Sequence, residues 1–301
     1  TKIIAVGQRG ANIWASWPAP LGMRLTCQPV TTLSTTTTFS ARVAIAIAAY
    51  NEAPHLAELV RRCVATRPAR IVIVDDCSTD ASAAVLAAIQ AEVGDLLVVL
   101  RNPRNLGKQG SVRRALRHLR GAAVDAVALI DGDLQHEPSE LPALAELLRD
   151  ADLVIGARAK TEMPAQRRLS NWCVNRLFRL ISGVDFGDVQ SGLRLYRKGL
   201  ADALGEALPE RGGFGVEHES LSIVAEVAGR VPGGVRAVAA PITCRYADEV
   251  SHIGARDVGR LAVATVRQAL RLIFDHLPAT SRGWRDVLAL IEAHPGWAQL
   301  N

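Results

Sequence analysis

Hydrophobic and polar positions change in regular blocks between residues 42 and 130. Short aliphatic runs, typical of buried strands, alternate with longer segments whose apolar residues recur at helical spacing. The pattern predicts strands at residues 43–48, 71–74, 96–101 and 126–130, and helices at residues 53–65, 81–93 and 110–119. This alternating order predicts an α/β fold with a Rossmann-like, mostly parallel central sheet and helices on both faces.

The pattern is less regular in the second half of the chain. It predicts helices at residues 139–149, 168–181 and 221–227, strands at residues 153–156 and 235–241, and a polar loop at residues 157–166. An irregular region of this kind often shapes the site of a second substrate. We therefore expect the acceptor of a transfer reaction to bind there.

Both ends of the chain differ from this central part. Residues 1–41 have no clear period and contain a Thr-rich run, so we expect an irregular tail. Residues 1–22 precede Met23, which raises the hypothesis that they lie upstream of the working protein. Residues 256–301 are expected to form a helical extension with a helix at residues 258–274. Its apolar and arginine positions fit either packing on the core or a basic amphipathic helix in the bilayer interface.

Composition narrows the class of protein. The chain has 301 residues, 49% of them hydrophobic, which is enough for one substantial core. Its net charge of +5 fits a solvated basic surface or attraction to phosphate groups. Zinc-finger spacing and RNA-recognition signatures are absent, which argues against nucleic-acid binding.

The cysteines and the apolar runs indicate a compartment. The five cysteines are odd in number and form no CxxC pair, which argues against a disulfide framework and favours a reducing environment. No apolar run approaches the roughly 20 residues that a membrane span needs. We expect a cytoplasmic protein, with peripheral contact at the cytoplasmic membrane face left open. The sequence does not indicate an oligomeric state.

Two acids follow the fourth predicted strand of the first half. Asp131 and Asp133 stand one residue apart, and like charges this close repel unless a cation or a proton joins them. Mg²⁺ or Mn²⁺ would join them, and Asp133 with Gln135 would connect the ion to a diphosphate. The alternative is a turn with two capping acids. Because ligands bind at the carboxyl ends of parallel strands, we favour the metal site.

Other polar groups follow the neighbouring strands. One of Asp75 and Asp76 is expected to accept a hydrogen bond from a nucleobase or a ribose, with Glu52 reaching the nucleoside from the first strand. The alternative is a cluster that only caps the next helix. Lys108 stands with glycines at a predicted helix start, which favours an anion. Walker-A spacing and the GxGxxG order are both absent, which argues against a dehydrogenase.

Five segments in order carry a family resemblance. The segments AAYNE, VDDCSTD, NLGKQGSVR, DGDLQHEP and DVQSGLRLYR resemble family 2 glycosyltransferases, specifically the polyprenyl-phosphate, dolichyl-phosphate mannose synthase-like branch. The resemblance covers about residues 42–255. It implies a GT-A fold, a GDP- or UDP-sugar donor and inversion at the anomeric carbon. It also implies a metal held by Asp131 and Asp133, with Gln135 nearby.

The resemblance also implies the remaining site residues. The element from Ser191 to Arg194 resembles one that lies near the acceptor phosphate in the family, and we add Arg245 to the acceptor site. Asp133, Asp188 and Arg194 are the candidate catalytic residues. The nucleotide-sugar candidates are Ala49, Tyr50, Glu52, Asp75, Asp76, Lys108, Asp131 and Gly132.

The acceptor decides the mechanism. A sugar hydroxyl, as on a polysaccharide or a glycolipid, needs a general base, for which Asp188 is the candidate. A dolichyl or undecaprenyl phosphate is already ionised and needs arginines instead, which the second half supplies. We favour the lipid phosphate. An inactive binding scaffold is less consistent with the retention of Asp131, Asp133 and Lys108, and His218, between two glutamates, is a weak candidate for a metal ligand.

Overall fold

The computed structural model supports a description of most of the central part of the chain. The described residues are 25–30, 41–159, 163, 168, 171–172, 174–176, 178–179, 184–210 and 215–244. The predicted helix at residues 258–274 and the acceptor candidate Arg245 lie outside them. None of the described helices is long and apolar enough to cross a bilayer.

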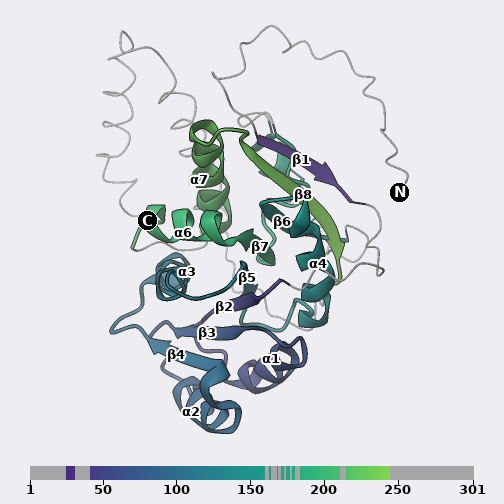
Figure 1. Ribbon diagram of the computed structural model, residues 1–301. Helices are drawn as coiled ribbons and strands as arrows, with labels where there is room; N and C mark the ends of the chain where they lie inside the picture. Colours follow the sequence, from purple (N-terminus) through teal and green to yellow (C-terminus); the bar gives the residue numbers. More distant parts are fainter. Residues whose placement is uncertain are drawn as a thin grey trace, which may run out of the picture.

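An eight-stranded sheet organises the described part of the fold (Figure 1). The strand order is β1-β8-β6-β7-β5-β2-β3-β4. β7 runs antiparallel to both of its neighbours, and all the other pairs are parallel. The strands are β1 Leu25–Pro29, β2 Val43–Ala49, β3 Arg70–Asp75, β4 Leu97–Arg101, β5 Ala126–Asp131, β6 Leu153–Arg158, β7 Arg194–Arg197 and β8 Val235–Ile242. The predicted mostly parallel sheet is confirmed.

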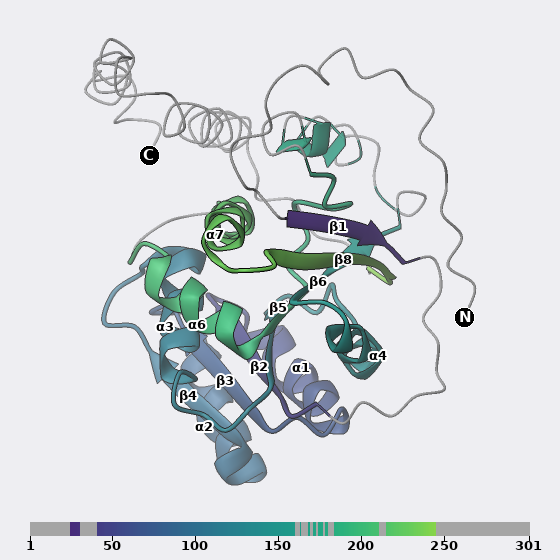
Figure 2. The same ribbon diagram turned by 45° about the horizontal axis from the view of Figure 1, so that its top comes forward.

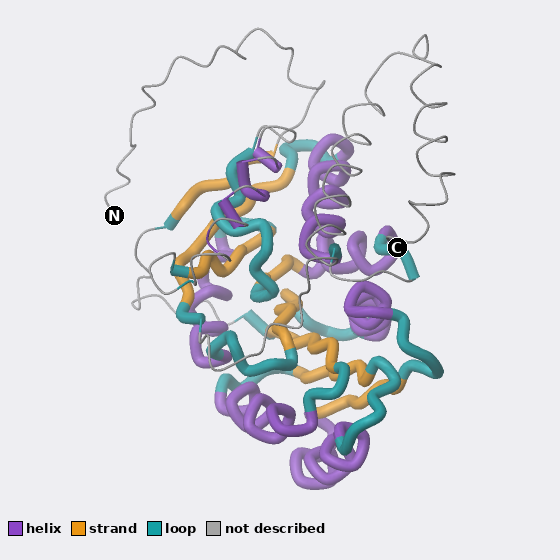
Figure 3. Tube along the Cα trace, turned by 180° about the vertical axis from the view of Figure 1, so that it is seen from behind, coloured by secondary structure: helices purple, strands orange, loops and turns teal. Residues whose placement is uncertain are grey.

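Helices cover both faces of the sheet, and two hydrophobic cores lie between the layers (Figures 1 and 3). One core packs the sheet against α1, α2 and α4, and the other packs it against α3, α6 and α7. The helices are α1 Ala53–Ala65, α2 Ser82–Val93, α3 Gly107–His118, α4 Leu141–Glu146, α6 Lys198–Ala207 and α7 Val216–Arg230, with short 3₁₀ turns at Gly94–Leu96, Pro138–Glu140 and Leu147–Arg149.

Strand β1 corrects the prediction of an irregular tail over residues 1–41. Figure 2 shows it alongside β8, at the edge of the sheet remote from β4. Its five residues pair in parallel with β8, from Leu25 opposite Val235 to Pro29 opposite Ala239. Apolar and polar residues do alternate from Leu25 to Pro29, but five residues beside a Thr-rich run are a weak strand signal, and the edge of a preformed sheet supplies the hydrogen bonds that order them.

Element ends also shift relative to the predictions. α3 begins at Gly107 rather than residue 110, and α7 spans fifteen residues rather than the predicted seven. The residues at these helix starts are polar, so the spacing of apolar residues does not indicate where each helix begins. Tertiary contacts extend both helices beyond their apolar part. The consequence is functional, because both extensions carry a charged residue, Lys108 and Glu217, into the same space.

Parallel register brings the strand ends together. Ala49 at the end of β2 lies opposite Asp75 of β3, and Ala48 lies opposite Asp131 of β5. Three loops therefore leave the sheet at one level. A Cβ atom on Gly132 would lie 3.3 Å from the Ala48 carbonyl oxygen, so only a small residue fits comfortably between these loops. This edge of the sheet forms the platform of the candidate site.

Candidate active site

The loops after β2 and β3 are hydrogen-bonded to each other. The Asn51 side-chain oxygen accepts the Thr79 backbone N–H at 2.8 Å, and the Asn51 N–H donates to the Ser78 hydroxyl at 2.9 Å. Asn51 and Cys77 adopt left-handed φ values of 57° and 63°, which these cross-loop contacts hold in place. Tyr50 lies exposed on this rim. The loops therefore form one surface rather than two independent segments.

The nearby acids already have protein partners. Asp76 is 2% exposed and accepts the backbone N–H groups of Leu106 and Gly107, each at 2.8 Å, together with the Asn102 amide at 2.6 Å. It therefore caps the start of α3, whereas the capping alternative expected the helix that directly follows these acids, which is α2. Asp75 accepts the Ser78 N–H and pairs with Arg101 at 2.9 Å.

Glu52 and Ala49 complete the nucleoside side of the rim. Glu52 lies at the start of α1 and accepts a hydrogen bond from His55 at 2.8 Å. Ala49 is buried at the end of β2, where its methyl group lies close to the position of Gly132. The structure thus brings the predicted nucleoside residues of three strand ends to one edge. Their contacts with a nucleotide stay a prediction.

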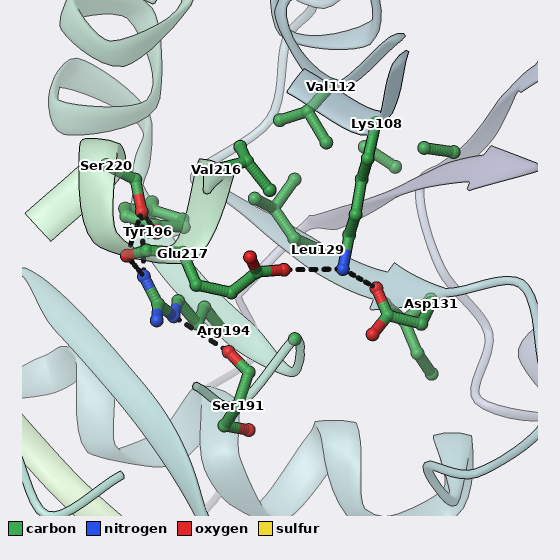
Figure 4. A pocket seen from close by; sticks show the side chains of 14 residues that line it. Lys108, Val112, Leu129, Asp131, Ser191, Arg194, Tyr196, Val216, Glu217 and Ser220 are labelled. Carbon is green, nitrogen blue, oxygen red and sulfur yellow. Dashed lines mark hydrogen bonds and ion pairs between the residues drawn. The ribbon is translucent and has the colours of Figure 1, made fainter. Parts of the chain in front are cut away.

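Lys108 lies at the centre of the site, between the two halves of the fold (Figure 4). It extends from the first turn of α3, and its ammonium nitrogen is 2.5 Å from a carboxylate oxygen of Asp131, at the end of β5, and 2.5 Å from one of Glu217, in the first turn of α7. A small cavity of about 20 Å³ adjoins these three groups and Ser191. That volume admits about one water molecule.

The two charges alter each other's protonation. Burial opposes the charge on Lys108, but the carboxylates of Asp131 and Glu217 outweigh burial and raise the pKa of the ammonium above its usual value. Burial likewise opposes the charge on Asp131, and nearby Lys108, together with His136 and Arg158, lowers the pKa of the carboxyl. Both groups therefore stay charged near neutral pH.

Asp133 and Gln135 lie on the turn that follows β5. The Asp133 carboxylate accepts the Gln135 backbone N–H at 3.1 Å, and Leu134 between them has a left-handed φ of 60°. Within the described ranges, no three His, Cys, Asp or Glu residues are grouped to hold a metal by themselves. Two carboxylates with most positions left to phosphate oxygens and water are the donor set that Mg²⁺ and Mn²⁺ accept, so these residues fit the predicted cation.

Arg194 is buried inside the acceptor side. It is 2% exposed, and its guanidinium donates to the backbone oxygens of Ser191, Val189 and Glu217 and to the Ser220 hydroxyl, at 2.7–3.0 Å. A direct contact with an acceptor would require some of these hydrogen bonds to break. In the observed contacts, Arg194 instead connects β7 to the start of α7. The Ser191 hydroxyl is buried without a hydrogen-bond partner, on the wall of the cavity.

Asp188 forms an ion pair that the sequence does not reveal. Its two carboxylate oxygens accept hydrogen bonds from the Arg158 guanidinium at 2.7 and 3.0 Å. Both side chains are largely buried. Arg158 ends β6, so it occupies a strand end on the same rim as Asp131, although β6 is separated from β5 by β7. Asp188 is thus held as the counter-ion of an arginine.

Three residues of the site were missed as site residues by the sequence reasoning: Arg158, Glu217 and Ser220. The rule that found Asp131 also applies to Arg158, because it is a charged residue directly after a buried aliphatic run. No local signal marks Glu217 or Ser220, because their neighbours in space come from distant parts of the sequence.

We predict that Gly192→Ala will destabilise the protein by about 1–3 kcal/mol, because overpacking beside a buried charge forces a shift. A Cβ atom at this position would overlap the Asp131 carboxylate. The free energy of unfolding, measured by urea denaturation, tests this. Gly199→Ala is the matched control, since a Cβ atom there meets no other atom and Ala suits a helix. Equal stability of the two variants would contradict the prediction.

His218 generates a prediction on pH. Both of its ring nitrogens are buried without a partner, and burial lowers its pKa to about 4. An unfolded histidine takes up a proton near pH 6.5, so between pH 6.5 and 4 the unfolded state binds more protons. The free energy of unfolding should therefore fall as the pH falls through this window.

His218→Phe is expected to remove that part of the pH dependence while keeping an aromatic ring beside Phe178. Urea denaturation at stepped pH measures it. His118→Phe, at an exposed position of α3, is the control and should keep the slope of the unmodified protein. An unchanged slope in His218→Phe would show that another group causes the acid sensitivity.

Comparison with known proteins agrees with this geometry. The model of the family "Glycosyl transferase family 2" matches residues 44–205, more than half of the chain. An undecaprenyl-phosphate 4-deoxy-4-formamido-L-arabinose transferase from Sodalis glossinidius (strain morsitans) is 35% identical over 169 residues, covering 54% of this chain and 51% of the relative. One of the same name from Pseudomonas aeruginosa (strain LESB58) is 34% identical over 168 residues, covering 54% and 49%. The chain thus spans about half the length of these curated relatives.

Solved structures show the same fold at low identity. Glucosyl-3-phosphoglycerate synthase from Mycobacterium tuberculosis, in complex with phosphoglyceric acid, has a TM-score of 0.58 and 15% identity, covering 82% of this chain and 88% of that one. The mannosyltransferase PcManGT from Pyrobaculum calidifontis, in complex with GDP-Man and Mn²⁺, has a TM-score of 0.56 and 19% identity, covering 87% and 73%. The GT-A fold is confirmed, and the chain belongs to family 2 of the glycosyltransferases.

Proposed function

We propose that this glycosyltransferase moves a sugar, with inversion, from a nucleoside diphosphate sugar to a polyprenyl phosphate. The curated relatives, about half of whose length is matched by this chain, are named as undecaprenyl-phosphate sugar transferases. Two solved structures of the same fold hold UDP or GDP-Man together with Mn²⁺. Because a polyprenyl chain stays in the bilayer, transfer would take place at a membrane surface.

The donor would lie along the rim formed by β2, β3 and β5. Tyr50 is exposed for contact with the base, and Glu52 offers acceptor oxygens to base or ribose N–H and O–H groups. Asp75 is buried, with its oxygens accepting from Ser78 and Arg101, so it shapes the loop after β3. Asp76 contributes indirectly, by fixing the start of α3 that carries Lys108. Gly132 lets the diphosphate approach the backbone after β5 closely.

Asp131 and Asp133 would hold Mg²⁺ or Mn²⁺, with Gln135 beside them. The bound cation would stabilise the departing nucleoside diphosphate by neutralising its charge. Lys108 supplies a second positive charge on the same side. These groups would favour departure of the nucleoside diphosphate. The acceptor itself would supply the attacking oxygen.

The ion pair between Asp188 and Arg158 is the observation that carries the choice of acceptor. A general base must have an oxygen available for the proton it removes, whereas both Asp188 oxygens already accept hydrogen bonds from a guanidinium. A phosphate acceptor is ionised at neutral pH and needs a positively charged cradle. Arg158, already paired with Asp188, is one of the charges that act on Asp131, and the unpartnered Ser191 hydroxyl lies on the wall of the cavity beside Asp131. Arg194 holds the Ser191 segment in position.

A donor and acceptor panel tests the proposal. The full chain is incubated with UDP- and GDP-sugars and Mg²⁺ or Mn²⁺, with either a short polyprenyl phosphate or a dephosphorylated polyprenol. We expect glycolipid to form only with the phosphate. Asp133→Asn should lower the rate about a hundredfold or more, because metal stabilisation of a leaving group is worth several kcal/mol. Transfer to the polyprenol alone would overturn the choice of acceptor.

Asp188→Asn separates positioning from base catalysis. An asparagine still presents one oxygen to Arg158, so we expect weaker use of the acceptor with the shape of the pH–rate profile unchanged. Loss of a base would instead remove the acidic limb of that profile and cost about 10²–10⁴-fold in rate. Profiles of kcat/KM for the acceptor between pH 5 and 9 distinguish these outcomes.

A further inference from the structure

The Lys108 ammonium occupies the space between two carboxylates that come from different halves of the fold. Asp131 belongs to the donor half and Glu217 to the helix that follows the acceptor segment. Each carboxylate has an oxygen 2.5 Å from the same nitrogen (Figure 4). The three side chains are 27%, 24% and 12% exposed, in the order Lys108, Asp131 and Glu217, so water screens their charges only in part. This ammonium is the cation that compensates both acids.

The other positive groups around Asp131 cannot replace it. Arg158 is held by the Asp188 carboxylate, and the His136 ring nitrogen lies 4.0 Å from Asp131, beyond hydrogen-bond distance. Without Lys108, Asp131 and Glu217 would approach each other uncompensated, with Asp133 two residues away. Two partly buried carboxylates that face one space, with Asp133 on the turn that follows Asp131, attract a divalent cation.

We propose that Lys108 is an internal competitor of the divalent cation and makes metal binding depend on the nucleoside diphosphate. A metal ion alone has to displace the ammonium from Asp131. A metal ion that arrives with a diphosphate brings anionic oxygens, which give the ammonium a new partner. Metal and donor should therefore raise each other's affinity reciprocally. This inference rests on the proposed function.

Glu217 has a defined part in this arrangement. It anchors the ammonium from the acceptor side, and its backbone oxygen accepts a hydrogen bond from Arg194, which also donates to the Ser191 carbonyl. The start of α7 therefore contacts Lys108 directly and, through Arg194, the segment that contains Ser191. A shift of Lys108 toward a bound diphosphate would alter the Glu217 contact on that side. We assign Glu217 as a positioning residue, not a catalytic one.

Binding of Mn²⁺ to the full chain tests the proposal independently of transfer activity. The concentration of free Mn²⁺ is followed by electron paramagnetic resonance, without nucleotide and with UDP or GDP. For the unmodified protein we expect nucleotide to tighten Mn²⁺ binding about tenfold or more. Lys108→Met should bind Mn²⁺ without nucleotide about tenfold more tightly than the unmodified protein, because removing one unit charge at ion-pair distance is worth more than 1 kcal/mol here.

Two further variants serve as controls. Arg117→Met removes a positive charge from an exposed position of the same helix and should leave Mn²⁺ binding unchanged. Lys108→Met combined with Glu217→Gln should keep part of the gain, because Asp131 is still freed from the ammonium while the unpaired negative charge of Glu217 is removed. If Lys108→Met binds Mn²⁺ no more tightly than Arg117→Met, the proposal is overturned.

Thermal melting covers the case in which Lys108→Met is unstable. Uncompensated acids should lower its melting temperature, and Mn²⁺ without nucleotide should raise it again by binding the folded state. Glu217→Gln by itself keeps the ammonium on Asp131 and should keep nucleotide-dependent Mn²⁺ binding. Loss of that dependence in Glu217→Gln would contradict the role of Lys108.

The same measurements separate this inference from the proposed function. If the unmodified protein binds no Mn²⁺ even with UDP or GDP, the metal assignment of the proposed function fails. If nucleotide promotes Mn²⁺ binding equally in the unmodified protein and in Lys108→Met, the metal assignment stands and only the competitor role of Lys108 fails.

Discussion

The in-register parallel pairing of β2, β3 and β5 is the constraint on which the rest of the site depends. Backbone hydrogen bonds align Ala49 with Asp75 and Ala48 with Asp131, so their loops begin at one level. A shift of register would move these residues along the sheet and separate them. Asn51 joins the loops after β2 and β3 by hydrogen bonds, and Asp76 accepts a hydrogen bond that holds the start of α3 at the same edge. These hydrogen bonds hold the side chains of the proposed donor site at one edge of the sheet.

Buried charges distinguish this site from the two hydrophobic cores around it. Three of them are compensated by a partner from a distant part of the chain: Lys108 by Glu217, Arg158 by Asp188, and Asp75 by the more exposed Arg101. An uncompensated charge at such positions would be costly, so these pairs restrict the arrangement of the elements that carry them. The site is therefore held by the same interactions that prepare it for charged substrates.

The two halves of the fold have different roles. The β2–β5 half repeats a regular βα pattern and carries the acids and backbone groups of the proposed donor site. The half formed by β6, β7 and α7 supplies arginines, whose donors mostly contact backbone oxygens and carboxylates. Arg194 shows the consequence: an arginine in a motif associated with the acceptor holds its segment together, while Arg158, outside that motif, pairs with Asp188.

The sequence alone determined the fold class, the family resemblance and the donor rim. Aliphatic runs and helical spacing are local signals, and acids directly after a buried strand mark the ligand edge of a parallel sheet. Strand β1 was missed, because a five-residue alternation is a weak local signal and its order comes from pairing with β8. The partners of Asp188, Lys108 and Arg194 were also decided only by the tertiary structure. The residues bonded in these contacts lie 23 to 109 positions apart in the sequence. No local pattern indicates which distant group will contact a buried charged side chain.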